Sequence, residues 1–209
     1  MNNGTILVFG AHPDDVEIGM GGTIKKLSEK HKVITCIASL PNKTQTRKKE
    51  TASAAQILGV ETVRHLALSP HTFGFNRETI KKIDALIETY RPQNVFTHWI
   101  GDSHQDHTYL TQCVFAAARH NHFNVLMYEQ AIPGGITHTT FRPQLFVDIS
   151  FQLEDKIKSI LAHKTQHKKY GDGWIQGVRG RAMHRGYQIK TVAAEAFEIV
   201  KIKEDLRLL

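Results

Sequence analysis

The chain has 209 residues, a formal net charge of +7 and 41% hydrophobic residues. This length favours one α/β domain over two, and the apolar content is sufficient for a hydrophobic core. No apolar run approaches the roughly 20 residues that span a bilayer, and the N-terminus lacks the features of a signal peptide. We therefore expect a single cytoplasmic domain over residues 1–209, with no membrane span.

Strand-like and helix-like segments alternate in the first part of the chain. Apolar, β-branched runs predict strands at residues 5–11, 32–40, 63–68 and 94–99. Helical spacing of apolar residues predicts helices at residues 15–30, 46–58, 77–90 and 107–120. This order predicts a Rossmann-like, three-layer αβα fold with a mainly parallel sheet and an active site at the C-terminal ends of the strands.

The remaining segments are less regular. Two further strands are expected at residues 125–129 and 144–149, followed by one helix at 150–169 that Ser150 caps. The apolar residues 192–200 fit either a helix or a strand. Residues 69–76, 132–142 and 170–185, rich in Gly, Arg and polar side chains, are expected to be loops that set substrate specificity.

The cysteine and basic residues argue against a disulfide-stabilised protein and against a nucleic-acid-binding protein. Cys36 and Cys113 lie among apolar neighbours, so they are expected to be buried free thiols and not a disulfide framework. The clusters of Lys and Arg contain few aromatic residues and no recognised nucleic-acid motif, so we expect no nucleic-acid partner.

Polar clusters follow the first and fourth predicted strands. The first, "AHPDD", ends at Asp15, and the second, "SHQDH", ends at His107. The first has neither the G-x-G-x-x-G turn of a dinucleotide site nor a P-loop. Because the carboxyl ends of parallel strands meet at one sheet edge, the two clusters are expected to form one site.

The spacing within the clusters favours a metal site. His12 and Asp15 are three residues apart, so both can reach one ion across a tight turn, and His107 supplies a third ligand. Two imidazoles and one carboxylate form a common catalytic zinc set that leaves a position open for water. Asp14 is then free to act as a base toward that water.

The second cluster also offers groups for acid–base chemistry. His104 is suited to stabilise an oxyanion or to protonate a leaving amine, and Asp106 to orient His104 or another imidazole. The other histidines are expected at the surface or beside the site's residues; they are His31, His65, His71, His98, His120, His122, His138, His163, His167 and His184.

These motifs resemble those of the LmbE/PIG-L family of zinc-dependent N-deacetylases. The stretches "RKKETASAAQILGV" (residues 47–60) and "AAEAFE" (residues 193–198) also resemble the family pattern, although Val16 stands where Glu often follows the second aspartate. The resemblance implies a hydrolase that removes acetyl from an N-acetylglucosamine-type moiety of a small glycoconjugate. It also implies one Zn²⁺ per chain, with Fe²⁺ as another candidate ion, and a homo-oligomer, either trimer or hexamer.

The resemblance further implies a role for seven residues. These roles are metal ligand for His12, Asp15 and His107, general base for Asp14, oxyanion stabiliser and acid for His104, orienting partner for Asp106, and substrate contact for Arg47.

Two alternatives remain open from the sequence. One is a phosphoesterase with two manganese ions, which needs more carboxylates than the single three-ligand set found here. The other is a non-catalytic module that binds sugar or nucleic acid on the same fold. The presence of Asp14 and His104, which such a module would not need, disfavours it.

Overall fold

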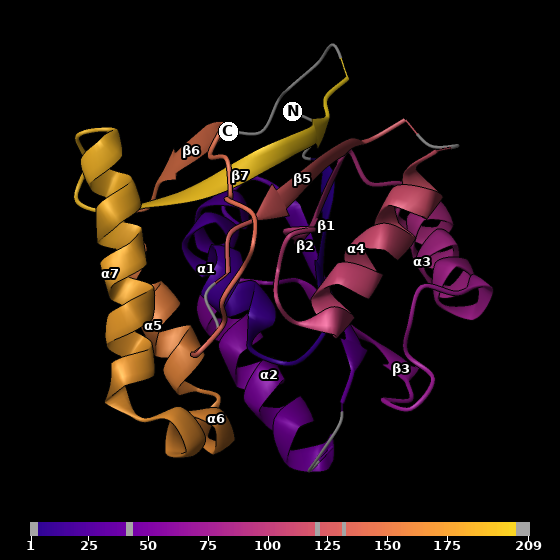
Figure 1. Ribbon diagram of the computed structural model, residues 1–209, viewed down its shortest axis with the longest axis horizontal. Helices are drawn as coiled ribbons and strands as arrows, with labels where there is room; N and C mark the ends of the chain where they lie inside the picture. Colours follow the sequence, from indigo (N-terminus) through magenta and orange to yellow (C-terminus); the bar gives the residue numbers. More distant parts are fainter. Residues whose placement is uncertain (1–3, 41–43, 120–121, 131–132, 204–209) are drawn as a thin grey trace.

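A seven-stranded sheet with helices on both faces forms the centre of the computed structural model, which describes residues 4–40, 44–119, 122–130 and 133–203 (Figure 1). The strands are β1 (Thr5–Gly10), β2 (Lys32–Ser39), β3 (Thr62–Leu68), β4 (Asn94–His98), β5 (Asn124–Tyr128), β6 (Leu145–Asp148) and β7 (Ala194–Lys201). The helices are α1 (Asp15–Leu27), α2 (Thr44–Leu58), α3 (Arg77–Tyr90), α4 (Gln105–Ala118), α5 (Leu153–Leu161), α6 (Lys164–Tyr170) and α7 (Asp172–Gln188).

The strand order is β3-β2-β1-β4-β5-β7-β6. Strands β1 to β5 pair in parallel, whereas β7 runs antiparallel to both β5 and β6. The predicted Rossmann-like fold with a mainly parallel sheet is therefore confirmed. The apolar segment that the sequence left unassigned is the antiparallel strand β7.

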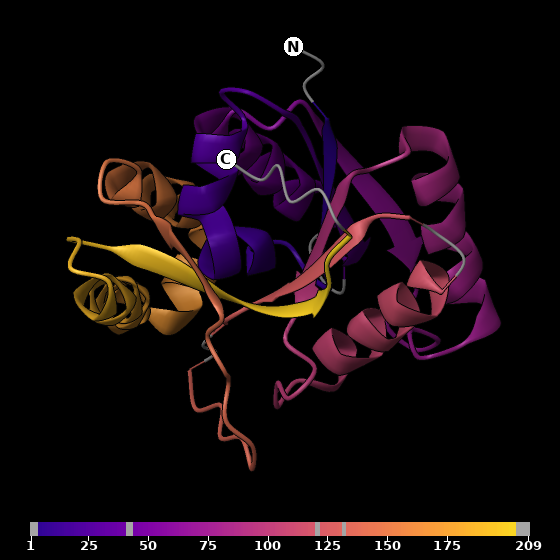
Figure 2. The same cartoon turned by 90° about the horizontal axis from the view of Figure 1, so that it is seen from above.

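Two hydrophobic clusters lie on opposite faces of the sheet. Ile6 and Val8 of β1 belong to the cluster beneath α1, α5 and α7, while Leu7 and Phe9 belong to the cluster beneath α3 and α4. Figure 2 shows these two helix groups on either side of the strands. Successive side chains of β1 point to opposite faces of the sheet, and because helices cover both faces, all of these side chains are apolar.

The chain changes direction across the sheet between β1 and β4. The connection from β1 leads outward to β2 and β3, and the connection from β4 leads to β5 on the other side. Such a topological switch point opens a crevice at the carboxyl ends of the two strands. Both polar clusters of the sequence follow these two strands, so the topology places them together.

Helix α1 is interrupted in its middle. Met20 has φ −149° and ψ 29°, which breaks the helical hydrogen-bond ladder at that point. Glycines allow close approach around the break, since a Cβ on Gly19 would lie 2.2 Å from the Tyr128 ring and one on Gly22 would lie 2.6 Å from Ile149. The absence of a side chain at both glycines therefore allows the helix to pack closely against Tyr128 and Ile149.

A buried ion pair completes the interrupted helix. The Glu195 carboxylate accepts hydrogen bonds from the backbone N–H of Gly22 (3.0 Å) and Thr23 (2.6 Å), which begin the second half. Lys156 Nζ donates to the Ile18 carbonyl (2.7 Å), which ends the first half, and to Glu195 (2.5 Å). Residues from α5 and β7 thus satisfy the backbone groups that the break leaves free.

The C-terminal half differs from expectation in three places. The predicted helix 150–169 is two helices, α5 and α6, separated at Ala162 and His163. Ser150 is not a helix cap, because its hydroxyl donates to Asp148 (2.6 Å). The expected loop 170–185 is mostly the helix α7, whose glycines hide its periodicity.

Other expectations concern single features. Cys36 and Cys113 are buried free thiols, as predicted. A helix was predicted over residues 107–120, and its last residue, His120, lies outside the described residues. Among the residues that the structure describes, no helix is long and apolar enough to cross a membrane.

Candidate active site

The two polar clusters meet at the carboxyl ends of β1 and β4. His12 Nε2 lies 2.9 Å from Asp106 Oδ2, although 94 residues separate the two. His107 Nε2 lies 3.4 Å from Asp15 Oδ1. The structure therefore brings the predicted residues of both clusters into one site.

Asp15 is a buried carboxylate at the centre of this site. It accepts hydrogen bonds from the His12 backbone N–H (2.7 Å) and from Gln130 Nε2 (2.9 Å). Burial alone raises the pKa of Asp15, but the charges of His107 and His98 outweigh it and hold the pKa well below its usual value. Asp15 therefore stays ionised, as a metal-binding carboxylate must.

His107 is held by a carboxylate that sequence reasoning did not select. Its Nδ1 lies 2.9 Å from Asp102 Oδ2, and Asp102 also accepts the His104 backbone N–H (2.8 Å). Burial lowers the pKa of His107, but Asp15 and Asp102 outweigh it and raise the pKa to about 10. The signal for Asp102 was its position two residues before His104 in the second cluster.

His98, at the end of β4, is a further residue of the site. Its ring stacks on that of His107 with 3.9 Å between centroids, and its Nε2 accepts the Ala11 backbone N–H (3.0 Å). Burial and His107 lower the pKa of His98 to about 4, so its ring is neutral. His98 was expected either at the surface or beside the residues of the site, and the structure shows the second position.

Asp14 occupies an unusual backbone conformation. Its φ is +92°, a backbone conformation that costs a non-glycine residue of order 1–3 kcal/mol and persists only where the surrounding structure holds it. Arg47 holds this turn, since its Nη2 donates to the Pro13 carbonyl (2.6 Å) and lies 3.7 Å from Asp14 Oδ1. Burial and the neighbouring Asp15 raise the pKa of Asp14 to about 7.

His104 and Asp106 form the start of helix α4. His104 is its N-cap and accepts the Asp106 backbone N–H at Nδ1 (3.2 Å). The Asp106 side chain contacts His12, not His104. Asp106 was expected to orient His104 or another imidazole, and the imidazole that it contacts is that of His12, because helix geometry turns the carboxylate toward the first cluster.

Two overlapping groups of donor atoms could hold an ion among the described residues. One is His12, His104 and His107, and the other is Asp15, His98 and His107, with the donor atoms of each group within 4.8 Å of one another. Of the predicted set, His12 belongs to the first group, Asp15 to the second and His107 to both. Imidazole nitrogens and a carboxylate oxygen are the donors that zinc prefers when cysteine is absent.

A cavity of about 420 Å³ opens over these residues. Asp14, His104 and Arg47 line it together with His12, Asp15 and His107, and residues of α6 and α7 such as Trp174 form the opposite wall. This volume lies within the usual range for small-molecule sites, roughly 300–1,000 Å³. All seven residues selected from the sequence except Asp106 line this cavity.

Comparisons with known proteins agree with this description. The family PIG-L, described as GlcNAc-PI de-N-acetylase, matches residues 7–118. The diacetylchitobiose deacetylase of Thermococcus kodakarensis is 27% identical over 185 residues, which cover 77% of this chain and 69% of that protein. The solved structure of the N,N'-diacetylchitobiose deacetylase from Pyrococcus horikoshii superposes with a TM-score of 0.82 and 25% identity, covering 100% of this chain and 90% of that one.

A third relative shows that the fold alone does not determine the chemistry. The 4-carboxy-2-hydroxymuconate hydratase GalB from Pseudomonas putida has a TM-score of 0.81 at 19% identity, with 97% of this chain and 99% of that one covered. This likeness concerns the fold only.

Fold and site together define a Rossmann-like protein with a cluster of imidazoles and carboxylates at the switch point of its sheet. The family match covers more than half of the chain and includes both polar clusters. The chain belongs to the PIG-L family and is an N-deacetylase, a hydrolase of amide bonds.

Proposed function

We propose that this enzyme removes the acetyl group from an N-acetylglucosamine moiety of a small glycoconjugate, with one zinc ion held by His12, Asp15 and His107. The observation that carries the proposal is the pairing of each ligand imidazole with a carboxylate of its own. Asp106 contacts His12 Nε2, and Asp102 contacts His107 Nδ1. Such partners fix the ring and direct its other nitrogen to a metal.

The free ring nitrogens and Asp15 converge. His12 Nδ1 lies 3.7 Å from Asp15 Oδ2, and His107 Nε2 lies 3.4 Å from Asp15 Oδ1. His107 must give up its proton to bind zinc, and the cation would then offset the negative charge of Asp15 in place of that proton. His98 fits less well as a ligand, because its Nε2 already accepts the Ala11 N–H.

Asp14 and His104 have separate proposed roles in the reaction. A bound zinc ion supplies Lewis-acid polarisation of the acetyl carbonyl and lowers the pKa of a water to roughly 7. Asp14 takes a proton from the attacking water. His104 accepts a hydrogen bond at Nδ1, so its proton lies at Nε2, where it donates a hydrogen bond to the oxyanion. The proton that Asp14 took from the water then passes to the leaving amine as the C–N bond breaks.

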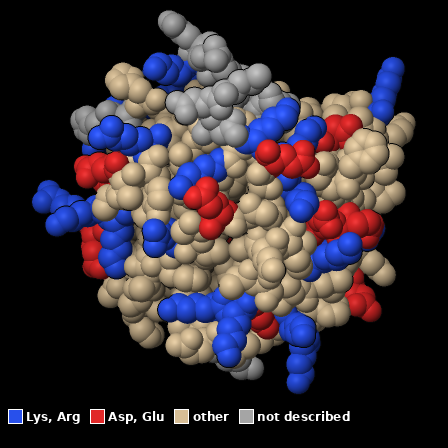
Figure 3. All heavy atoms as spheres, turned by 180° about the vertical axis from the view of Figure 1, so that it is seen from behind, with Lys and Arg blue, Asp and Glu red and all other residues tan. Residues whose placement is uncertain are grey.

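The rival functions lack comparable support. A two-manganese phosphoesterase needs carboxylates that bridge two ions, whereas Asp14, the neighbour of Asp15, faces Arg47. A nucleic-acid-binding module would gather basic residues on one surface. On the face shown in Figure 3, Lys and Arg are interspersed with Asp and Glu.

Removal of metal tests the proposed reaction. Treating the protein with a zinc chelator is expected to abolish release of free amine from N-acetylglucosamine conjugates, and one equivalent of Zn²⁺ per chain is expected to restore it. Fluorescamine detection measures the amine, and elemental analysis measures the metal. Two ions per chain with phosphodiester hydrolysis would instead support the phosphoesterase.

The partner of His107 provides a second test. Asp102→Asn is expected to weaken zinc affinity about 10- to 100-fold, the usual cost of losing a carboxylate that orients a ligand histidine. A competition titration with a zinc-binding dye measures this affinity. Asp172→Asn is the matched control, since Asp172 also contacts a histidine, His167 (2.9 Å), but its side chain is 88% exposed. Equal zinc affinity in the wild type and Asp102→Asn would refute the assignment.

A further inference from the structure

A second cavity, of about 370 Å³, adjoins the proposed catalytic site. Gln130, which donates to Asp15, lines both cavities, and Asp102, which holds His107, lines the second one. Its other walls come from the end of β4, the loop after β5 and helix α7. A substrate whose acetylated sugar lies over Asp15 therefore has room on the far side of Gln130 for a second chemical group.

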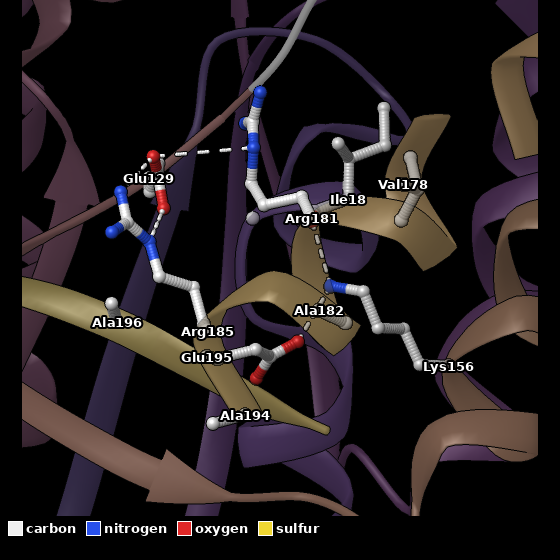
Figure 4. Close-up of a pocket in the computed structure, with 11 residues that line it drawn as sticks. Ile18, Glu129, Lys156, Val178, Arg181, Ala182, Arg185, Ala194, Glu195 and Ala196 are labelled. Atoms are coloured by element: carbon white, nitrogen blue, oxygen red, sulfur yellow. Dashed lines mark hydrogen bonds and ion pairs between the residues drawn. The ribbon is translucent and has the colours of Figure 1, made fainter. Parts of the chain in front are cut away.

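Most charged side chains in and below this second cavity are already paired. Arg185 donates two hydrogen bonds to the carboxylate of Glu129, at 2.7 and 2.6 Å. Lys156 and Glu195 form the buried pair under α1. Figure 4 shows both pairs lining a separate, smaller cavity that shares Glu129, Arg181 and Arg185 with the second one, and it also marks the longer contact between Arg181 and Glu129. These contacts leave each of the four charges with an opposite charge at hydrogen-bond distance.

Arg181 is the exception. Its Nε lies 4.0 Å from Glu129 Oε1, beyond hydrogen-bond distance, and this carboxylate already accepts both bonds from Arg185. Among the described residues, no hydrogen bond from the five N–H donors of Arg181 is present, although its side chain is only 31% exposed. Burial lowers the pKa of Arg181 and Arg185 adds to the effect, while Glu129 and Asp102 offset part of it. Arg181 therefore has a long ion pair with Glu129, and its N–H fork has no hydrogen-bond acceptor among the described residues.

Hydroxyl groups also line this second cavity. Ser103, Thr139 and Thr140 line it and are exposed. Together with a guanidinium fork, hydroxyls are suited to the oxygen atoms of a carboxylate or a phosphate. Arg47, the arginine selected from the sequence, is less available for this purpose because it holds the Pro13 carbonyl and faces Asp14.

We propose that this second cavity, with Arg181 as its anchor, binds an anionic group, either a carboxylate or a phosphate, on the part of the substrate beyond the acetylated sugar. The proposal rests on the deacetylation proposed above and adds a specificity-determining residue to it. It assigns Arg181 to binding and not to the chemical step.

Three glycosides of N-acetylglucosamine test the proposal: a methyl glycoside, one with a carboxylate on the aglycone and one with a phosphate. Arg181→Gln is expected to lower the ratio of anionic to neutral kcat/KM about 10- to 100-fold, because a hydrogen bond to a charged group contributes about 1.5–3 kcal/mol. The anion with the larger loss identifies the preferred group. Arg181→Lys, which keeps the charge but not the fork, is expected to retain part of the preference.

Arg179→Gln is the matched control. Arg179 lies on the same helix, but it pairs with Glu154 (2.5 Å) at the surface. This variant is expected to keep the wild-type ratio. A ratio that Arg181→Gln leaves unchanged for both anions would overturn the proposal.

Calorimetric binding of the same glycosides separates failure of this inference from failure of the proposed function. If the wild type releases no amine from any glycoside, the deacetylation proposal fails. Weaker binding of an anionic glycoside by Arg181→Gln, with methyl glycoside binding kept, still supports the anion site. Equal binding of the anionic glycosides by both proteins overturns it.

Discussion

Asp14→Asn is expected to lower kcat for deacetylation by about 10²- to 10⁴-fold, the usual contribution of a positioned general base. The substitution keeps the size of the side chain and a hydrogen-bond acceptor but removes the atom that takes the proton. Because Asp14 is not among the proposed ligands, zinc content is expected to stay at one ion per chain. Steady-state kinetics and elemental analysis of the same preparation measure both quantities.

Asp84→Asn on α3 is the control for this experiment, since α3 covers the face of the sheet opposite α1. It is expected to keep wild-type kcat. Turnover near the wild-type value in Asp14→Asn would assign the base to another residue. Loss of zinc together with activity would instead make Asp14 a part of the metal site.

Lys156→Met is expected to destabilise the protein by about 3–5 kcal/mol, because removing one partner leaves the other as an uncompensated buried charge. Here the remaining charge is Glu195, 4% exposed in the ion pair, and the Ile18 carbonyl also loses its donor. Urea unfolding measures the change in the free energy of unfolding. The double variant Lys156→Met/Glu195→Gln is expected to recover part of the loss, since glutamine keeps an acceptor for the α1 backbone.

Lys158→Met on the same helix is the matched control. Lys158 is 66% exposed and lies 3.6 Å from Asp155, so its loss is expected to change stability by no more than about 1 kcal/mol. Similar free energies of unfolding for Lys156→Met and Lys158→Met would show that the buried pair does not stabilise the interrupted helix.

The elements that follow a simple period were predictable from the sequence. Strand β1 is a short apolar run, and α3 has apolar residues on one face, an Asn76 cap and a stop at Arg91 before proline. Helix α7 was missed because its glycines weaken the helical signal, and its formation depends on packing Trp174 and Val178 against the core. In such segments, tertiary contacts and not local sequence determine whether a helix forms.

The candidate site was predictable where the motif is local. His12 and Asp15 share one turn, and His104 and Asp106 share another, so spacing alone suggested their proximity. Gln130 was not predictable, because it reaches Asp15 from the end of β5, 115 residues away. The sequence left the partner of Asp106 open between His104 and another imidazole for the same reason, since the direction of its side chain depends on how β1 and β4 lie in the sheet.

The contacts of Lys156 and Glu195 with the backbone of α1 have a consequence for the order in which the parts of the enzyme are completed during synthesis. Every proposed metal ligand has been synthesised by His107, but the carboxylate that completes the helix after Asp15 belongs to Glu195 in the last strand. A nascent chain without β7 therefore contains the catalytic groups while the second half of α1 still lacks its cap. The helix that carries Asp15 is therefore complete only after the C-terminal strand has been synthesised.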